Sequence, residues 1–214
     1  MLYNTHTHTP DVQPGITALY NQFPHEDFQA QGPFSTGIHP WHIDANTWRS
    51  HLEQVATWLQ HPQALALGEC GLDNRRPIDM KLQIDVFEAQ LELAKNCQKP
   101  VVLHLVDAWD ALLASVKKVK PHVPLLVHGF SKSQGLAQQL LQQGFYLSFG
   151  KYLMQNPELG AIFAEVPVGR YLLETDMSPW PLAEVYARAA ACRGSSVAQV
   201  TDEVAATWEQ IFHT

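Results

Sequence analysis

Metal-binding side chains follow short apolar runs at several points along this chain. The runs are too short to form helices and have the length of buried strands. Imidazole nitrogens and carboxylate oxygens are common ligands of divalent transition metals. Six such residues predict a site for two divalent ions, with Zn, Mg and Mn as the candidates. The residues are His6, His8, Glu69, His104, His128 and Asp176.

The apolar runs alternate with amphipathic patterns, which indicates a parallel sheet built from βαβ units. The runs occupy residues 2–5, 16–20, 34–38, 64–67, 101–103, 125–127, 145–149 and 171–173. Apolar residues at spacings of three and four predict helices around residues 48–59, 84–94, 109–116, 136–141 and 197–211. We expect Ser131 to cap the fourth of these helices.

Eight parallel strands are typical of the closed (β/α)8 barrel. We therefore expect an α/β chain with a TIM-type (β/α)8 barrel, formed as a single domain over residues 1–214. Residues 7–15 and 21–33 each contain two prolines and show no helical stripe. One or two early helices are expected to be trimmed for this reason.

The predicted barrel would bring the six residues together, because all strands of this fold end at one face, where active sites form. His6 and His8 are separated by one residue, so both side chains point to the same side of an extended strand. A single histidine at a strand end is usually an ordinary polar residue near solvent. Six metal-binding residues at corresponding strand ends are harder to explain as independent accidents.

Composition excludes several classes of protein. The net charge of −7 argues against a broad basic surface for duplex DNA. The sequence has no continuous apolar stretch of the ~20 residues that a membrane span requires, and its first residues do not resemble a secretory signal. The three cysteines, Cys70, Cys97 and Cys192, are odd in number and widely spaced. This favours a reducing cytoplasm, and nothing indicates an obligate protein partner.

The sequence resembles the TatD family of metal-dependent hydrolases, within the amidohydrolase-like barrels. The matching pieces occur in family order and cover nearly the whole chain. They are residues 5–8 (Thr-His-Thr-His), 37–40 (Gly-Ile-His-Pro), 67–73 (Leu-Gly-Glu-Cys-Gly-Leu-Asp), 102–104 (Val-Leu-His), 127–131 (Val-His-Gly-Phe-Ser) and 173–179 (Leu-Glu-Thr-Asp-Met-Ser-Pro).

This resemblance implies a role for each predicted ligand. His6, His8 and Asp176 would hold the first ion, and His104 and His128 would hold the second. Glu69 would bridge the two ions. The family is known for metal-dependent deoxyribonuclease activity, including exonuclease action on single strands, so single-stranded DNA is the implied partner.

Three departures from the family pattern concern the substrate more than the ligands. Asn4 stands where the family usually has an aspartate, which should weaken the orientation of a ligand histidine. Val106 stands where the family usually has an arginine, which removes a phosphate clamp. The basic loop that follows the last strand in the family is absent.

These observations predict a metal-dependent hydrolase that cleaves phosphodiester bonds through a metal-activated water. Asp176 and Glu69 are the predicted catalytic residues, and Asp176 would also accept a proton from the water. His39, Trp41, Lys132 and Lys151 are predicted substrate contacts near strand ends.

Two alternatives stay open at this point. The same metal site would suit a hydrolase of a small phosphoester, amide or lactone, because one barrel hosts many chemistries. A non-catalytic metal-binding protein is the second alternative, although the complete ligand set argues against it.

Overall fold

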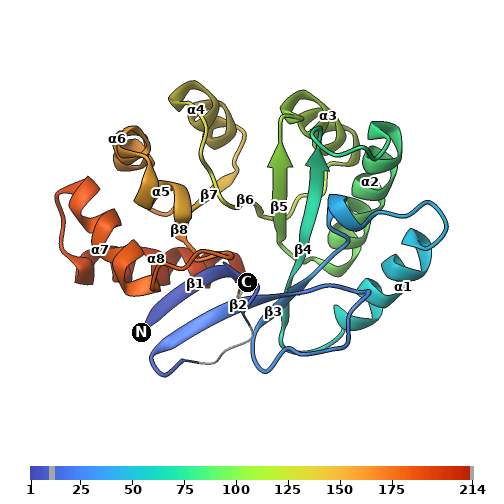
Figure 1. Ribbon diagram of the computed structural model, residues 1–214, viewed down its shortest axis with the longest axis horizontal. Helices are drawn as coiled ribbons and strands as arrows, with labels where there is room; N and C mark the ends of the chain where they lie inside the picture. The colour runs from blue at the N-terminus through green and yellow to red at the C-terminus, as the bar shows by residue number, and fades with distance from the viewer. Residues whose placement is uncertain (10–12, 213–214) are drawn as a thin grey trace. The chain divides into compact units, whose positions relative to one another are not determined.

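The computed structural model describes residues 1–9 and 13–212 (Figure 1). The predicted apolar runs form strands β1 (Leu2–Thr7), β2 (Ile16–Gln22), β3 (Phe34–Thr36), β4 (Ala64–Asp73), β5 (Val101–Val106), β6 (Leu125–Val127), β7 (Tyr146–Phe149) and β8 (Tyr171–Leu173). The α-helices are α1 (Trp48–Trp58), α2 (Met80–Cys97), α3 (Trp109–Val119), α4 (Gln134–Gln142), α5 (Lys151–Gln155), α6 (Pro157–Glu165), α7 (Leu182–Arg193) and α8 (Val197–Phe212), and η1 (Pro40–His42) is a 3-10 turn.

The strands are hydrogen-bonded in chain order from β1 to β8. The pairs β1–β2, β3–β4, β4–β5, β6–β7 and β7–β8 are all parallel. A parallel bridge joins Thr7 of β1 to Asp176, which lies just beyond β8. This order is the one that a (β/α)8 fold requires, and it confirms the predicted fold class.

The early helices are trimmed as predicted. None of the described residues between β1 and β2, or between β2 and β3, is helical. Two other details differ from the sequence expectations. The helix α4 is capped by Ser133 and not by Ser131, because the Ser133 hydroxyl accepts the Leu136 N–H. The helices α5, α6 and α7 were not predicted.

Contacts divide the chain into two compact units. Unit 1 comprises Met1–Tyr20 and Leu126–Thr214, and unit 2 comprises Asn21–Leu125. The expectation of a single domain over residues 1–214 stays a prediction.

In unit 1, the last two helices hold the first strand (Figure 1). The Tyr3 ring on β1 lies 5.1 Å from the Trp208 ring on α8. The Tyr186 hydroxyl on α7 accepts the Tyr3 N–H at 3.0 Å and donates to the Tyr3 carbonyl at 2.8 Å. The strand that carries His6 and leads into His8 is therefore fixed by residues from the far end of the chain.

In unit 2, α2 packs on β4 and α3 packs on α2. Two buried glutamines of α2 hold strand ends through their amide groups. Gln83 accepts the Asp73 N–H at 2.9 Å, and Gln90 bonds both the N–H and the carbonyl of Ile38. The turn beyond β3 and the end of β4 are thereby tied to one helix.

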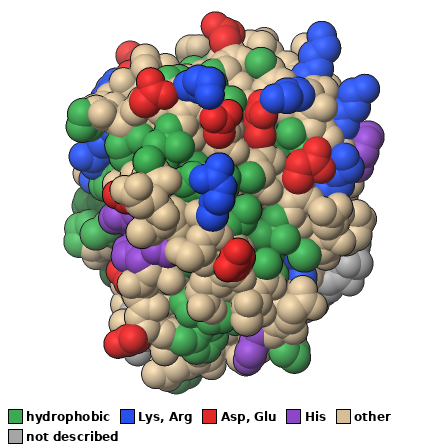
Figure 2. Space-filling view, turned by 90° about the vertical axis from the view of Figure 1, so that its right-hand side faces the viewer, with side chains coloured by type: hydrophobic (Ala, Val, Ile, Leu, Met, Phe, Trp, Pro, Cys, Tyr) green, Lys and Arg blue, Asp and Glu red, His purple; other side chains and the backbone are tan. Residues whose placement is uncertain are grey.

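One face of the molecule can be compared with the expectation from net charge. Figure 2 shows acidic and basic side chains interspersed on the face that it presents, so that face carries no broad basic surface. Among the described residues, no helix combines the length and the apolar character that crossing a membrane would require.

Candidate metal centre

In unit 1, three predicted ligands meet where β1 and β8 end. The ligand atoms of His6, His8 and Asp176 all lie within 4.8 Å of one another. The Oδ1 atom of Asp176 is 3.4 Å from Nε2 of His8 and 3.8 Å from Nε2 of His6. The backbone supports this approach, since the Asp176 N–H donates to the His6 carbonyl at 2.9 Å. Neighbouring strands thus supply a compact N,N,O donor set.

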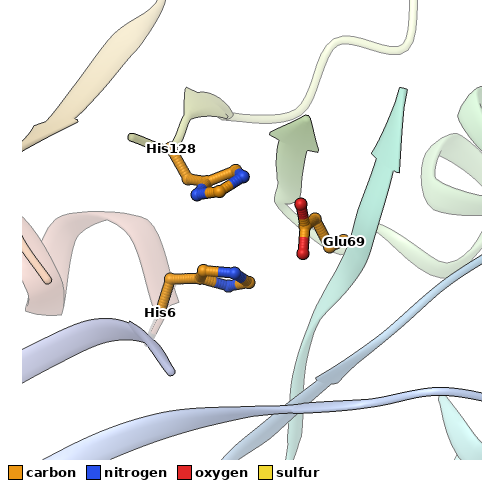
Figure 3. Close-up of side chains that lie close together, drawn as sticks. All are labelled: His6, Glu69 and His128. Atoms are coloured by element: carbon orange, nitrogen blue, oxygen red, sulfur yellow. The ribbon is translucent and has the colours of Figure 1, made fainter. Parts of the chain in front are cut away.

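A fourth predicted ligand of unit 1, His128, follows β6 and lies against His6. The two ring centroids are 4.3 Å apart, and Figure 3 shows one ring above the other. Glu174 lies next to His128, and its Oε1 atom is 3.4 Å from the Nδ1 atom of His128. The same oxygen accepts a hydrogen bond from the Gly129 N–H at 2.8 Å. Burial by itself raises the pKa of Glu174, but His128 and His6 bring the pKa below its ordinary value. Glu174 is therefore a buried carboxylate that orients His128.

Asn4 has a different role from the one that its sequence position suggested. Its Oδ1 atom accepts the Thr175 N–H at 2.9 Å, and its Nδ2 donates to the Thr175 hydroxyl at 2.8 Å. In the part of the chain that the structure describes, the hydrogen bonds of this amide therefore go to the residue before Asp176. The amide ties the segment that carries Asp176 to β1.

In unit 2, Glu69 is the centre of the second donor group. Ligand atoms of His39, Glu69 and His104 all lie within 4.8 Å of one another. Oε1 of Glu69 is 3.0 Å from Nε2 of His39 and 2.7 Å from Nδ1 of His104. The carboxylate projects from β4 (Figure 3) and is almost completely buried. Its backbone N–H donates to Oδ1 of Asn21 at 2.6 Å, which fixes the main chain at this point.

The tautomer of His39 follows from its neighbours. The Trp41 N–H donates to Nδ1 of His39 at 3.0 Å, so Nδ1 is an acceptor. In a neutral imidazole the other nitrogen then carries the hydrogen, and that nitrogen faces Glu69. His39 thus lies where it can donate a hydrogen bond to the Glu69 carboxylate.

Asp73, at the end of β4, links His104 to an aromatic side chain. Oδ2 of Asp73 accepts the Trp41 indole N–H at 2.6 Å and is 3.4 Å from Nε2 of His104. Burial raises the pKa of Asp73, but hydrogen bonds from Trp41, from the Arg75 backbone and from His104 outweigh it and lower the pKa. The Arg76 guanidinium lies 3.6 Å from the centroid of the Trp41 ring. A cation and an aromatic ring therefore lie beside the donor group of unit 2.

The structure places the remaining predicted residues as follows. Trp41 is 47% exposed, and His39 is buried. Lys132 follows β6, and Lys151 begins α5 directly after β7 with its Nζ 5.8 Å from the Tyr152 ring. Burial raises the pKa of the Cys70 thiol, which disfavours the thiolate form that a nucleophilic cysteine requires.

Both donor groups fit divalent metal ions. Each group offers two imidazoles and one carboxylate, the ligand types that Zn and Mn sites use in proteins. Sequence reasoning missed the two supporting carboxylates, Glu174 and Asp73. Each of them stands inside a motif that contains a ligand, since Glu174 is two residues from Asp176 and Asp73 is four residues from Glu69.

Sequence comparisons identify related proteins. The family model described as TatD related DNase matches residues 17–213. A 3'-5' ssDNA/RNA exonuclease TatD from Klebsiella pneumoniae (strain 342) is 36% identical over 152 residues, which is 68% of this chain and 57% of that protein. A protein of the same name from Enterobacter lignolyticus (strain SCF1) is 31% identical over 192 residues, covering 79% and 73%. The match thus spans little more than half the length of the Klebsiella protein.

Solved structures share the fold over nearly the whole chain. The TatD homologue YJJV from Escherichia coli K12 has a TM-score of 0.82 at 22% identity, covering 100% of this chain and 98% of that one. A hydrolase TatD family protein from Entamoeba histolytica has a TM-score of 0.83 at 13% identity, covering 99% and 97%. At these identities the likeness establishes the fold alone.

Proposed function

Because this chain belongs to the TatD-related DNase family, we propose that it is a metal-dependent hydrolase that cleaves phosphodiester bonds in single-stranded nucleic acid. The observation that carries the proposal is the donor group of His6, His8 and Asp176, whose ligand atoms lie within 4.8 Å of one another. The names of the relatives, which act on ssDNA and RNA, support the choice of substrate.

The proposed centre holds two divalent ions, with Zn, Mg and Mn as candidates. His6, His8 and Asp176 are the proposed ligands of the first ion, and His104 and His128 those of the second. Glu69 is proposed to serve both. Such ions would supply Lewis acidity toward a phosphate oxygen and an activated water.

The residues of the chain have their own tasks in this reaction. Asp176 is partly exposed, and its carboxylate is proposed to accept the proton that the attacking water loses. His39 would hold the Glu69 carboxylate through its Nε2 atom, at the 3.0 Å separation observed. Glu174 and Asp73 would orient His128 and His104. Outer carboxylates of this kind set the direction of a ligand imidazole and raise its basicity.

Substrate contacts are proposed for His39, Trp41, Lys132 and Lys151. Trp41 is the best supported by its surroundings, because its exposed ring lies 5.8 Å from the His104 ring. Aromatic rings bind single strands by stacking on bases without regard to sequence. Arg76, 3.6 Å from that ring, is a proposed phosphate contact that could replace the cation absent at Val106.

The test is hydrolysis of an end-labelled single-stranded oligonucleotide with Mg, Mn or Zn. We expect metal-dependent release of nucleotides, and a decrease of about 100-fold or more in Glu69→Gln, since that change removes a charged ligand. Glu53→Gln, an exposed position on α1, is the matched control and should retain full activity. Absence of hydrolysis with every metal, or full activity in Glu69→Gln, would contradict the proposal.

A second candidate is hydrolysis of a small phosphoester at the same centre. The observation that favours it is Val106, which occupies the position of the family's arginine. The assay separates the two candidates by comparing the oligonucleotide with bis-p-nitrophenyl phosphate. Turnover of the small ester without nuclease activity would select the second candidate.

A cytoplasmic location is also proposed, since Cys70, Cys97 and Cys192 are all free thiols.

A further inference from the structure

Unit 1 contains a cavity of about 420 Å³ next to the proposed ligands of the first ion. It lies between β1, β2 and the segment that leads from β8 to α7. The regular (β/α)8 fold places a helix between the first two strands, whereas none of the described residues there is helical. Ile16 and Ala18, which share one face of β2, line the cavity.

The described lining of the cavity is neutral. None of the described residues that line it is charged. Hydroxyl groups come from Thr7, Thr175 and Ser178, and apolar surface comes from Ala18 and neighbouring proline rings. A phosphate group would require cations or several N–H donors. The cavity therefore suits a neutral, partly apolar group that also forms hydrogen bonds.

Trp180 supplies an aromatic surface at this cavity. The residue is 36% exposed and lies between Pro179 and Pro181. Its backbone N–H donates to the Ser178 hydroxyl at 3.2 Å, which holds the turn. Within the described ranges, the indole ring forms neither a hydrogen bond nor a ring contact with the protein. Trp180 lines the cavity, and stacking of bases on tryptophan is favourable.

The walls of the cavity belong to the same short segments as the ligands. Thr7 stands between His6 and His8 in the chain, and Thr175 immediately precedes Asp176. None of the three proposed ligands lines the cavity, but a molecule bound there would contact the residues that adjoin them in the chain.

The geometry points to a subsite that binds the neutral base of a nucleotide, with Trp180 as the stacking surface. As a substrate subsite it rests on the proposed function, because the phosphate attached to that base would then lie toward His8 and Asp176. The volume of about 420 Å³ is within the usual range of small-molecule sites, ~300–1,000 Å³. The neutral lining explains why the cavity would select the base and leave the phosphate outside.

The first experiment measures binding of uncharged nucleosides, thymidine and adenosine, to the full chain by equilibrium dialysis. The wild-type protein should bind at least one of them saturably. Trp180→Ala should weaken binding at least tenfold, whereas Trp180→Phe, which keeps a ring, should lose less than threefold. Ala18→Leu should also weaken binding, because it fills the cavity from the opposite wall. Met177→Ala is the control, since Met177 is highly exposed in the same segment and does not line the cavity.

The second experiment compares KM values for an oligonucleotide and for bis-p-nitrophenyl phosphate. Trp180→Ala should raise KM for the oligonucleotide and leave turnover of the small ester unchanged. No saturable nucleoside binding by the wild type, or equal binding by Trp180→Ala and Ala18→Leu, would overturn the inference. Nucleoside binding needs no hydrolysis. If the protein binds nucleosides but cleaves no phosphodiester, the proposed function is wrong and the inferred subsite still stands.

Discussion

Replacing Glu174 by glutamine should weaken metal binding while leaving the fold intact. Oε1 of Glu174 accepts the Gly129 N–H at 2.8 Å and lies 3.4 Å from Nδ1 of His128. A glutamine oxygen can still accept from Gly129, but the negative charge beside the imidazole is lost. Removing an outer partner of a ligand histidine typically costs ~10–100-fold in metal affinity.

The structure assigns the two ends of that range. Both contacts are made by Oε1, so Glu174→Gln can keep them and loses only the charge, and it should weaken affinity by about tenfold, or ~1.4 kcal/mol. Glu174→Ala loses both contacts and should approach about 100-fold. Competition for Zn against a chromogenic chelator at pH 7 measures both. Glu184→Gln, an exposed glutamate on α7, should bind as the wild type does.

The same carboxylate should make stability depend on pH in the metal-free protein. The folded state lowers the pKa of Glu174 below its ordinary value of 4.5, so the charged form stabilises the fold above that pH. This contribution is lost as pH falls from 4.5 through the folded pKa. The stability difference between wild type and Glu174→Gln should therefore shrink in acid. Wild-type metal affinity in Glu174→Gln would refute the reasoning about His128.

Other substitutions test separate parts of the molecule. Gly71→Ala should destabilise the protein by ~2–4 kcal/mol in urea unfolding, because a Cβ atom at this φ of +148° would lie 1.9 Å from the His104 carbonyl oxygen. An unchanged unfolding midpoint would show that the backbone around residue 71 can shift to accommodate the Cβ atom. Burial and the nearby His25 lower the pKa of His42 from 6.5, so wild-type stability should fall as pH drops below 6.5, and His42→Gln should flatten this slope. Equal slopes of stability against pH in the wild type and in His42→Gln would contradict this role of His42. Asn4→Ala removes both hydrogen bonds of a buried amide and should cost ~1–3 kcal/mol, with thermal unfolding as the measurement.

The strands were predictable because each is a short apolar run that polar residues follow. The runs at β6 and β8 match the structure residue for residue. The run at β4 was predicted to stop before Glu69, but the strand continues to Asp73. Its pairing with β5 shifts register between Leu67 and Cys70. Such an irregularity depends on the neighbouring strand and leaves little trace in hydrophobic periodicity.

The helix α7 was missed because alanines stand on both its buried and its exposed face. Leu182, Val185, Tyr186, Ala189 and Ala190 are buried at helical spacing. The exposed positions of this helix also include alanines, so the contrast between its two faces is weak. The sequence indicates such a helix only through its end, where Gly194 adopts a left-handed conformation.

The donor residues of the candidate site were predictable by type and by position at strand ends. Their supporting contacts were not. The hydrogen bonds of Asn4 to Thr175 join residues 171 positions apart. Whether an amide at that position orients a histidine or a neighbouring strand depends on where its side chain lies, which spacing along the chain does not specify.

The hold of α7 and α8 on the first strand has a consequence for synthesis. Unit 2 is one continuous segment that can assemble as it leaves the ribosome. The strand that bears His6 and leads into His8 can form its contacts with Asp176, Tyr186 and Trp208 only after those residues have been translated, far later. The proposed site for the first ion would thus form in each new chain only when its translation is almost finished.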